Sequence, residues 1–228
     1  MNDGAPFFRH IRTLFYLIWV TFLFLPQGVI AGEAQNGNAY LRGIAKRYEA
    51  VQFFRAKFVQ VSKAPGVVKN ERASGIVYLR KDGKFRWDYD QPDIVLIISD
   101  GKTLWIYQPE DKQVMVDRTF RRRMKRFPYT FLKGMGNLER DFTARVLRQT
   151  GETVTLILNP KRPIKEIKAM EVTFNPHTFL IHRISWTSSQ GVKTIISFKD
   201  IDITSKIPES IFRFEPPPGV DIVDANAP

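Results

Sequence analysis

The chain has 228 residues, 43% of them hydrophobic, which is enough for one domain, or at most two, with a core of useful size. It contains no cysteine, which excludes disulfides, thiol chemistry and a lipid-modified N-terminal cysteine. The formal net charge of +12 favours anionic partners: nucleic acid for a cytoplasmic protein, and lipid headgroups or an acidic protein surface for an exported one.

The first thirty residues have the parts of a secretory signal peptide. A basic stretch precedes Thr13–Leu25, which is apolar and uncharged, and small residues follow. A helix of that length rises about 20 Å, less than the ~30 Å hydrocarbon core of a bilayer, which argues against a membrane anchor. We therefore predict a signal peptide over residues 1–31, cleaved near Ala31 or Ala34, and export of a single domain, residues 32–228, to the periplasm.

The spacing of apolar residues changes after the first fifty positions. Helical spacing predicts an amphipathic helix over Ala39–Val51, and a period of two then predicts strands joined by short turns, hence antiparallel hairpins. The expected strands are Phe53–Ser62, Ala73–Arg80, Phe85–Tyr89, Ile94–Ser99, Thr103–Tyr107, Gln113–Val116, Phe142–Arg148, Thr153–Leu158, Lys168–Phe174, Phe179–Trp186 and Val192–Phe198, with a short terminal piece at Phe212–Phe214. Arg118–Arg140 interrupts the alternation and is expected to form one or two short helices.

Alternation within the strands predicts a sheet with one buried face. Phe85, Trp87 and Tyr89 share one face of their strand, and charged residues occupy the other. Three architectures remain open: a packed sandwich of two sheets, a closed barrel, and a curled open sheet partly covered by short helices. The curled sheet would leave a cavity, which is a common kind of ligand site.

Residues that could perform catalysis are few. The two histidines of the mature chain, His177 and His182, have no spacing typical of a metal site, and we predict no metal. Ser99-Asp100-Gly101 is more typical of a hairpin turn than of a nucleophile. Asp88 and Asp90 share a strand face, as the carboxylates of a glycoside hydrolase could, but they fit better as wet-face neighbours of an arginine. We therefore predict a protein that is not an enzyme, with no catalytic residues and no cofactor.

The strongest charge feature is a basic run inside Arg118–Arg140. It consists of Arg121, Arg122, Arg123, Lys125 and Arg126. As a solvated face it would have no partner. As a docking patch, next to the proposed helical cover, it would bind anionic headgroups or an acidic protein.

Five stretches give the chain a resemblance to the periplasmic outer-membrane lipoprotein carriers, the LolA-type chaperones. They occur in the family's order across nearly all of the mature chain: FFRAKFVQ at Phe53–Gln60, SGIVYLRKDGKFRWDYDQP at Ser74–Pro92, SDGKTLWIYQPEDKQV at Ser99–Val114, GNLERDF at Gly136–Phe142 and FRFEPPPGV at Phe212–Val220. The resemblance implies a mainly β fold, an unclosed antiparallel half-barrel of about eleven strands with a lid of short α-helices. It also implies a monomeric carrier of acylated lipoproteins that does not bind nucleic acid. An inner-membrane ABC-type release complex would load it, and an outer-membrane lipoprotein receptor would accept the cargo.

The resemblance also assigns residues to a lipid site. The wall of the cavity would be formed by Phe58, Tyr78, Phe85, Trp87, Tyr89, Val95, Ile97, Trp105, Tyr107, Met170 and Phe174. The lid would contribute Leu41, Ile44, Tyr48, Phe131, Leu132 and Met135.

One position departs from the family pattern. Family members often carry Arg-Pro where this chain has Lys81-Asp82, and that arginine hydrogen-bonds the lid shut. Arg80 lies one place earlier. Because a shift of one residue along a strand points the side chain to the opposite face, we predict Lys81 as the lid latch, with Arg80 as the alternative.

Three other functions stay open at this point. The same fold could serve as a lipid or lipoprotein sensor, or carry another lipid cargo. A hydrolase would use Asp88 and Asp90. A basic nucleic-acid binder would require the chain to remain in the cytoplasm.

Overall fold

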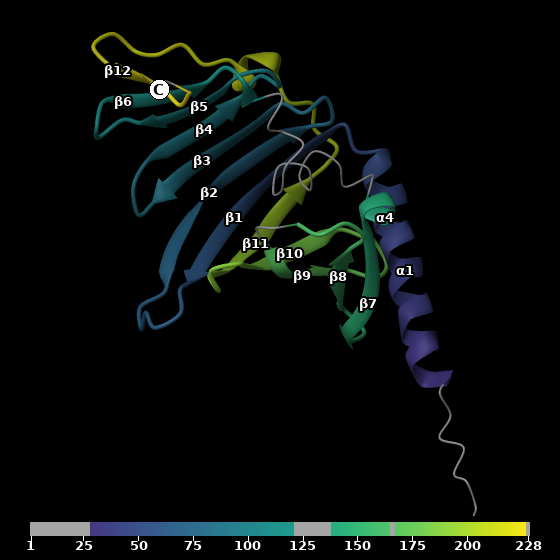
Figure 1. Ribbon diagram of the computed structural model, residues 1–228. Coiled ribbons are helices and arrows are strands. Elements are labelled where there is room, and N and C mark those ends of the chain that lie inside the picture. The colour runs from purple at the N-terminus through teal and green to yellow at the C-terminus, as the bar shows by residue number, and fades with distance from the viewer. Residues whose placement is uncertain (1–27, 121–137, 165–166, 227–228) are drawn as a thin grey trace, which may run out of the picture.

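A curved sheet dominates the computed structural model, which describes residues 28–120, 138–164 and 167–226 (Figure 1). Twelve strands form the sheet within these ranges. They are β1 (Phe53–Lys63), β2 (Glu71–Arg80), β3 (Phe85–Gln91), β4 (Val95–Ser99), β5 (Leu104–Gln108), β6 (Gln113–Asp117), β7 (Phe142–Gln149), β8 (Val154–Pro160), β9 (Ile167–Phe174), β10 (Ile181–Ser188), β11 (Lys193–Asp202) and β12 (Asp221–Asp224).

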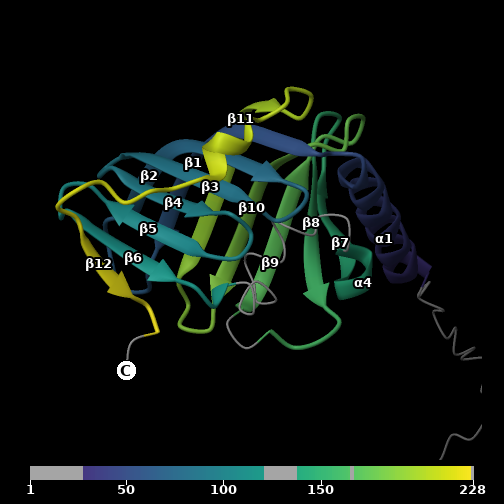
Figure 2. The same cartoon turned by 90° about the horizontal axis from the view of Figure 1, so that it is seen from above.

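The order of the strands shows an open sheet. It runs β12-β6-β5-β4-β3-β2-β1-β11-β10-β9-β8-β7, so two antiparallel meanders are joined where β1 pairs with β11. The strand β12 is the exception, because it pairs with β6 in parallel. The two outermost strands, β12 and β7, lie at opposite edges (Figure 2). The predicted fold class, an unclosed and mainly antiparallel sheet with short helices, is confirmed.

The C-terminal region differs from expectation. The predicted strand Phe212–Phe214 is wrong: Glu209–Phe212 forms a 3-10 helix, η2, and the last strand is β12. Phe212 is buried against the sheet, and Pro216, Pro217 and Pro218 follow soon after it. Proline has no N–H group to donate to a neighbouring strand, so the chain cannot pair until it has passed them.

The first helix is longer than its sequence pattern suggested. It is α1, Gly28–Glu49, where Ala39–Val51 was expected. It ends because the N–H of Val51 turns back to the carbonyl of Tyr48 before the chain enters β1. None of the helices within the described residues is both long and apolar enough to span a bilayer. Residues 1–27 lie outside the described part, and signal-peptide cleavage stays a prediction.

The helix α1 lies along the β7 edge of the sheet (Figures 1 and 2). The side-chain oxygen of Asn38 accepts a hydrogen bond of 2.9 Å from the N–H of Ala144 on β7. A short helix, α4 (Leu138–Asp141), precedes β7, and its Glu139 lies 3.6 Å from the guanidinium of Arg42 on α1. These contacts fix α1 beside the sheet, with its apolar side towards the core.

Candidate functional site

The inner face of the sheet, defined here as the face that carries the core, is continuous from β5 to β7. Trp87 on β3 lies opposite Val77 on β2 and Ile97 on β4. Phe58 on β1 pairs with Phe198 of β11, which extends the same face into the second meander. Eight of the eleven predicted wall residues lie on this face: Phe58, Phe85, Trp87, Tyr89, Val95, Ile97, Met170 and Phe174.

An aromatic cluster forms where a strand lacks a side chain. Phe58 and Tyr89 flank Gly75, which lies between them on β2. Strands two places apart are separated by about 9.6 Å, yet the ring centroids of Phe58 and Tyr89 are 4.9 Å apart. The rings can converge in this way because Gly75 has no side chain to hold them apart. Trp87 joins the cluster at 4.7 Å from Phe58.

Three predicted wall residues lie on the other side of the sheet. On β2 the inner residues are Val77 and Leu79, so Tyr78 points outward, where the guanidinium of Arg55 lies 5.8 Å from its ring centroid. On β5 the inner residues are Leu104 and Ile106, so Trp105 and Tyr107 also point outward. Assigning Tyr78, Trp105 and Tyr107 to the same wall as Phe85 was therefore wrong, because the strand register places them on the opposite face.

The inner face is covered in this structure. Phe58, Phe85 and Trp87 are only 2%, 7% and 6% exposed. The predicted lid residues Leu41, Ile44 and Tyr48 on α1 are buried in the same cluster. Phe120, which follows β6, packs edge-on against Phe85 with ring centroids 5.7 Å apart. The other predicted lid residues, Phe131, Leu132 and Met135, and the basic run at Arg121, Arg122, Arg123, Lys125 and Arg126 lie outside the described residues.

A buried tyrosine joins α1 to the sheet. The hydroxyl oxygen of Tyr48 accepts a hydrogen bond of 3.1 Å from the N–H of Ile181 at the start of β10. Burial raises the pKa of Tyr48 to about 12, although this hydrogen bond acts in the opposite direction. The phenol therefore stays neutral over the usual pH range, and α1 is held over β10 at its C-terminal turn.

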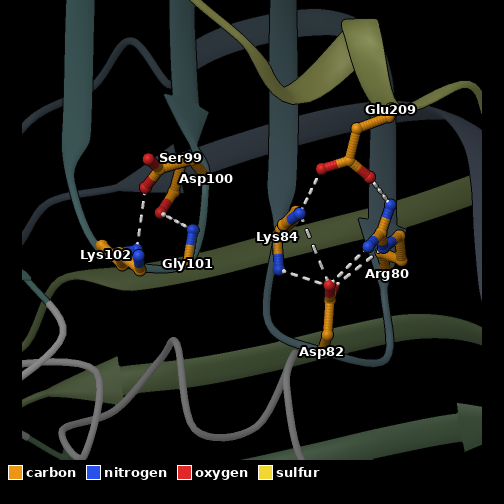
Figure 3. A network of polar contacts seen from close by, with 8 residues as sticks. All are labelled: Arg80, Asp82, Lys84, Ser99, Asp100, Gly101, Lys102 and Glu209. Carbon is orange, nitrogen blue, oxygen red and sulfur yellow. Dashed lines mark hydrogen bonds and ion pairs between the residues drawn. The ribbon is translucent and has the colours of Figure 1, made fainter.

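The two latch candidates make different contacts. The ammonium nitrogen of Lys81 donates a hydrogen bond to the carbonyl oxygen of Glu49, the last residue of α1, and the main-chain N–H of Lys81 donates to the carbonyl of Gln52. Arg80 points away from α1 and donates to Asp82 and Glu209 instead (Figure 3). Lys81 is thus the one of the two that touches the covering helix.

The contacts of Arg80 belong to a charge cluster on the outer face. Its carboxylates are Asp82 and Glu209, and its cations are Arg80 and Lys84 (Figure 3). Partial burial alone would raise the pKa of Asp82, but the hydrogen bonds from Arg80 and from the N–H of Lys84, together with their charges, hold that pKa below its usual value. Glu209 opens η2, so the cluster ties the C-terminal part of the chain to the β2–β3 turn.

The C-terminal strap, defined here as residues 203–220, continues across the outer face after η2. The carbonyl of Ile211 accepts a hydrogen bond from Arg86 at 3.3 Å. The ring of Phe214 lies 6.3 Å from that of Trp105 and 5.4 Å from that of Tyr107. The strap therefore covers the outward-pointing aromatic residues of β5. The sequence analysis did not predict that this segment covers the outer face. The available signal was the alternation of apolar and polar residues just before the three consecutive prolines.

The remaining candidates for chemistry have structural partners. Asp88 accepts a hydrogen bond of 2.6 Å from Arg86, and Asp90 accepts one of 2.8 Å from the hydroxyl of Ser74. Ser99 donates to the carbonyl of Thr103 within the β4–β5 turn, as its turn-like sequence predicted (Figure 3 shows this turn). Within the described ranges no group of three or more His, Cys, Asp or Glu side chains is placed to hold a metal ion.

Comparison with known proteins identifies the family. The family model "Outer membrane lipoprotein carrier protein LolA" matches residues 49–215. The outer-membrane lipoprotein carrier protein of Chromohalobacter salexigens is 29% identical over 194 residues, which cover 85% of this chain and 90% of that protein. The protein of the same name from Nitrosomonas europaea is 32% identical over 170 residues, 75% of this chain and 82% of that protein. The crystal structure of an uncharacterized conserved protein from Thermus thermophilus shares the fold, with a TM-score of 0.53 at 13% identity over 82% of this chain and 97% of that one. The family model matches more than half of the chain, from the last residue of α1 into the strap. This chain therefore belongs to the LolA family of outer membrane lipoprotein carrier proteins.

Proposed function

We propose that this protein is a periplasmic carrier that receives the acyl chains of lipoproteins against the inner face of its sheet. It would accept its cargo from an inner-membrane release complex and pass it to an outer-membrane receptor. The observation that carries the proposal is the continuous apolar inner face beneath a helical cover, in a chain of the LolA family. The names of the relatives from Chromohalobacter salexigens and Nitrosomonas europaea support lipoproteins as the cargo.

The energetics of an acyl chain limit how such a carrier can work. Burying one CH₂ group is worth ~0.8 kcal/mol, so a chain of ~16 carbons is held in a membrane by about 12 kcal/mol. A cargo with several such chains does not leave a bilayer unaided, so loading requires work done by the release complex. The carrier itself needs an affinity moderate enough to allow release.

The covered inner face offers a way to keep the affinity moderate. Acyl chains can reach Phe58, Phe85 and Trp87 only if part of the cover moves, since these side chains are buried in the closed state. If the open state is a minority, the apparent affinity for lipid falls in proportion to its population. The contact of Tyr48 on α1 with β10, and that of Lys81 with the last residue of α1, would set that population.

The test compares the two faces of the sheet by photo-crosslinking in the periplasm. p-Benzoylphenylalanine in place of Phe85 should crosslink to acylated lipoproteins, because position 85 lies on the inner face. The same residue in place of Tyr107, an aromatic position on the outer face, should not. Native mass spectrometry of the purified protein should show co-purified acylated species.

Two variants then measure the need for an apolar inner face. Phe85→Glu should abolish co-purification of acylated cargo, and Phe85→Leu should retain it. Circular dichroism establishes that both are folded, and the crosslinking result stands even if Phe85→Glu does not fold. Crosslinking of cargo at position 107 but not at position 85 would contradict the proposal.

A further inference from the structure

The tip of the β1–β2 hairpin exposes two valines. In Figure 1 the turn of this hairpin extends beyond the ends of β3 and β4. Val67 is 57% exposed and Val68 is fully exposed. Hairpin turns are usually built from polar residues and glycine, so adjacent apolar side chains at a projecting turn need an explanation.

The tip has a defined conformation. The N–H of Val67 donates a hydrogen bond of 3.3 Å to the carbonyl of Ala64, and Gly66 has a φ of +74°, which favours glycine. Pro65 packs closely against Gly191 in the β10–β11 turn, where an added Cβ atom would lie 2.9 Å from the Cγ atom of Pro65. The neighbouring hairpin therefore supports the tip and directs the valines into solvent.

The charges around the valines are mostly positive. Residues 63–72 contain three cations, Lys63, Lys69 and Arg72, and one carboxylate, Glu71, for a net charge of +2. All four are exposed, and none forms an ion pair with another described residue. Their charges are thus available to a partner.

Other exposed apolar side chains have a different setting. Ile94, at the β3–β4 turn, follows Asp93, and Ile222 and Val223 lie between Asp221 and Asp224 on β12. Leu147 precedes Arg148 on the edge strand β7, and Met115 lies on β6, so neither is on a projecting turn. Among these residues, the β1–β2 tip combines apolar exposure, positive charge and projection.

We propose that the β1–β2 tip is a contact site for the surface of an anionic phospholipid bilayer. Val67 and Val68 would enter the headgroup region, and Lys63, Lys69 and Arg72 would lie near the anionic headgroups. Such a contact is reversible, because it buries little apolar area and uses few charges. The inference is independent of the cargo: the tip lies apart from the inner face, and the test below contains no lipoprotein.

The test measures binding of the purified exported chain to vesicles by co-sedimentation. Vesicles of equal parts phosphatidylethanolamine and phosphatidylglycerol should bind the protein, more weakly as salt is added, and phosphatidylcholine vesicles should not. The double variant Val67→Ser, Val68→Ser should bind at least about fivefold more weakly. Lys69→Ala should bind up to about fivefold more weakly, the equivalent of ~1 kcal/mol per basic residue.

A control variant and a local reporter show whether the tip itself makes the contact. Leu147→Ser removes an apolar side chain that is 48% exposed and lies beside Arg148 on β7, and should bind like the wild type. Because the chain has no cysteine, Val68→Cys gives a single labelling site for an environment-sensitive fluorophore. Its emission should shift to the blue on anionic vesicles.

Three outcomes would overturn the proposal. The first is a fluorophore at position 68 that does not respond to anionic vesicles. The second is a loss of binding in Leu147→Ser equal to that in the double valine variant. The third is a fluorophore that responds only to membranes carrying inner- or outer-membrane proteins, which would assign the tip to a protein partner.

Discussion

The ammonium group of Lys81 donates a hydrogen bond of 2.6 Å to the main-chain carbonyl oxygen of Glu49, the last residue of α1. The final carbonyls of a helix have no partners within the helix, and a cation beside them also interacts favourably with the helix dipole. One side chain from the β2–β3 turn therefore helps to hold the covering helix against the sheet.

Lys81→Met should loosen the C-terminal turn of α1. The bond is exposed, so its loss should cost about 1 kcal/mol or less, which would increase the open population by up to about fivefold. Amide hydrogen exchange in the last turn of α1 should be faster, and an apolar dye should bind more tightly. Lys102→Met, at an exposed lysine of the β4–β5 turn, provides the control. Unchanged exchange in α1 would show that Lys81 does not restrain it.

Tyr48→Phe should change the response of stability to alkaline pH. The phenol has a pKa of about 12 in the folded protein, above the ordinary value of 10.0. Folding therefore favours the neutral phenol. The resulting contribution to the unfolding free energy is complete below about pH 10 and is lost as the pH rises towards 12. Between pH 8 and pH 11 the wild type should lose about 1 kcal/mol more of its unfolding free energy than the variant.

The same variant should be less stable at neutral pH. Removing the hydroxyl leaves the buried N–H of Ile181 without its acceptor, which costs about 1–3 kcal/mol. Urea denaturation at pH 8 and pH 11 measures both effects. Equal losses of stability in the two proteins between these pH values would argue against a raised pKa at Tyr48.

Glu209→Gln should loosen the strap without affecting the inner face. The carboxylate of Glu209 accepts hydrogen bonds from Arg80 and Lys84, and the variant removes its charge. We expect a loss of about 1 kcal/mol or less, because the pair is partly exposed, with faster hydrogen exchange in η2 and β12 and unchanged exchange in α1. Glu215→Gln, at an exposed position of the same strap, is the matched control. If hydrogen exchange in η2 and β12 is equally fast in both variants, the charge cluster does not hold the strap.

Gly75→Ala should destabilise the sheet. A Cβ atom at this position would collide with the main-chain carbonyl oxygen of Asp88 on β3, which cannot move without disturbing the β2–β3 pairing. We expect a loss of at least about 2 kcal/mol, in the range of overpacked core positions. Gly151→Ala, where a Cβ atom would meet open space, should change stability by less than about 0.5 kcal/mol. Chemical denaturation of both variants measures the difference, and a stable Gly75→Ala protein would require β2 and β3 to separate locally.

The sequence predicted the strands well because their alternation and turn residues are local signals. Most boundaries agree to within two residues, and the inner positions of β1 and β3 follow from strict alternation. The same rule fails on β5, whose residues Leu104–Gln108 read LWIYQ and are apolar on both faces. Only the pairing with β4 shows that Leu104 is inner and Trp105 outer.

The parts that could not be predicted depend on contacts between distant segments. The strap covers Trp105 and Tyr107 with residues more than a hundred positions later in the chain, so no local pattern reveals that the outer face is apolar there. The alternation of side chains along a strand was enough to favour Lys81 over Arg80 as the latch. The partner of Arg80 could not be predicted, because Glu209 lies far away in the sequence.

Both edges of the sheet have features that disfavour pairing with a strand from another molecule. At β7 the N–H of Ala144 is occupied by Asn38 of α1, and at β12 the exposed Asp221 would repel the same edge of a second copy. If the cover is displaced to admit acyl chains, as proposed, the chain would thereby be less prone to polymerise through backbone pairing while its inner face is exposed.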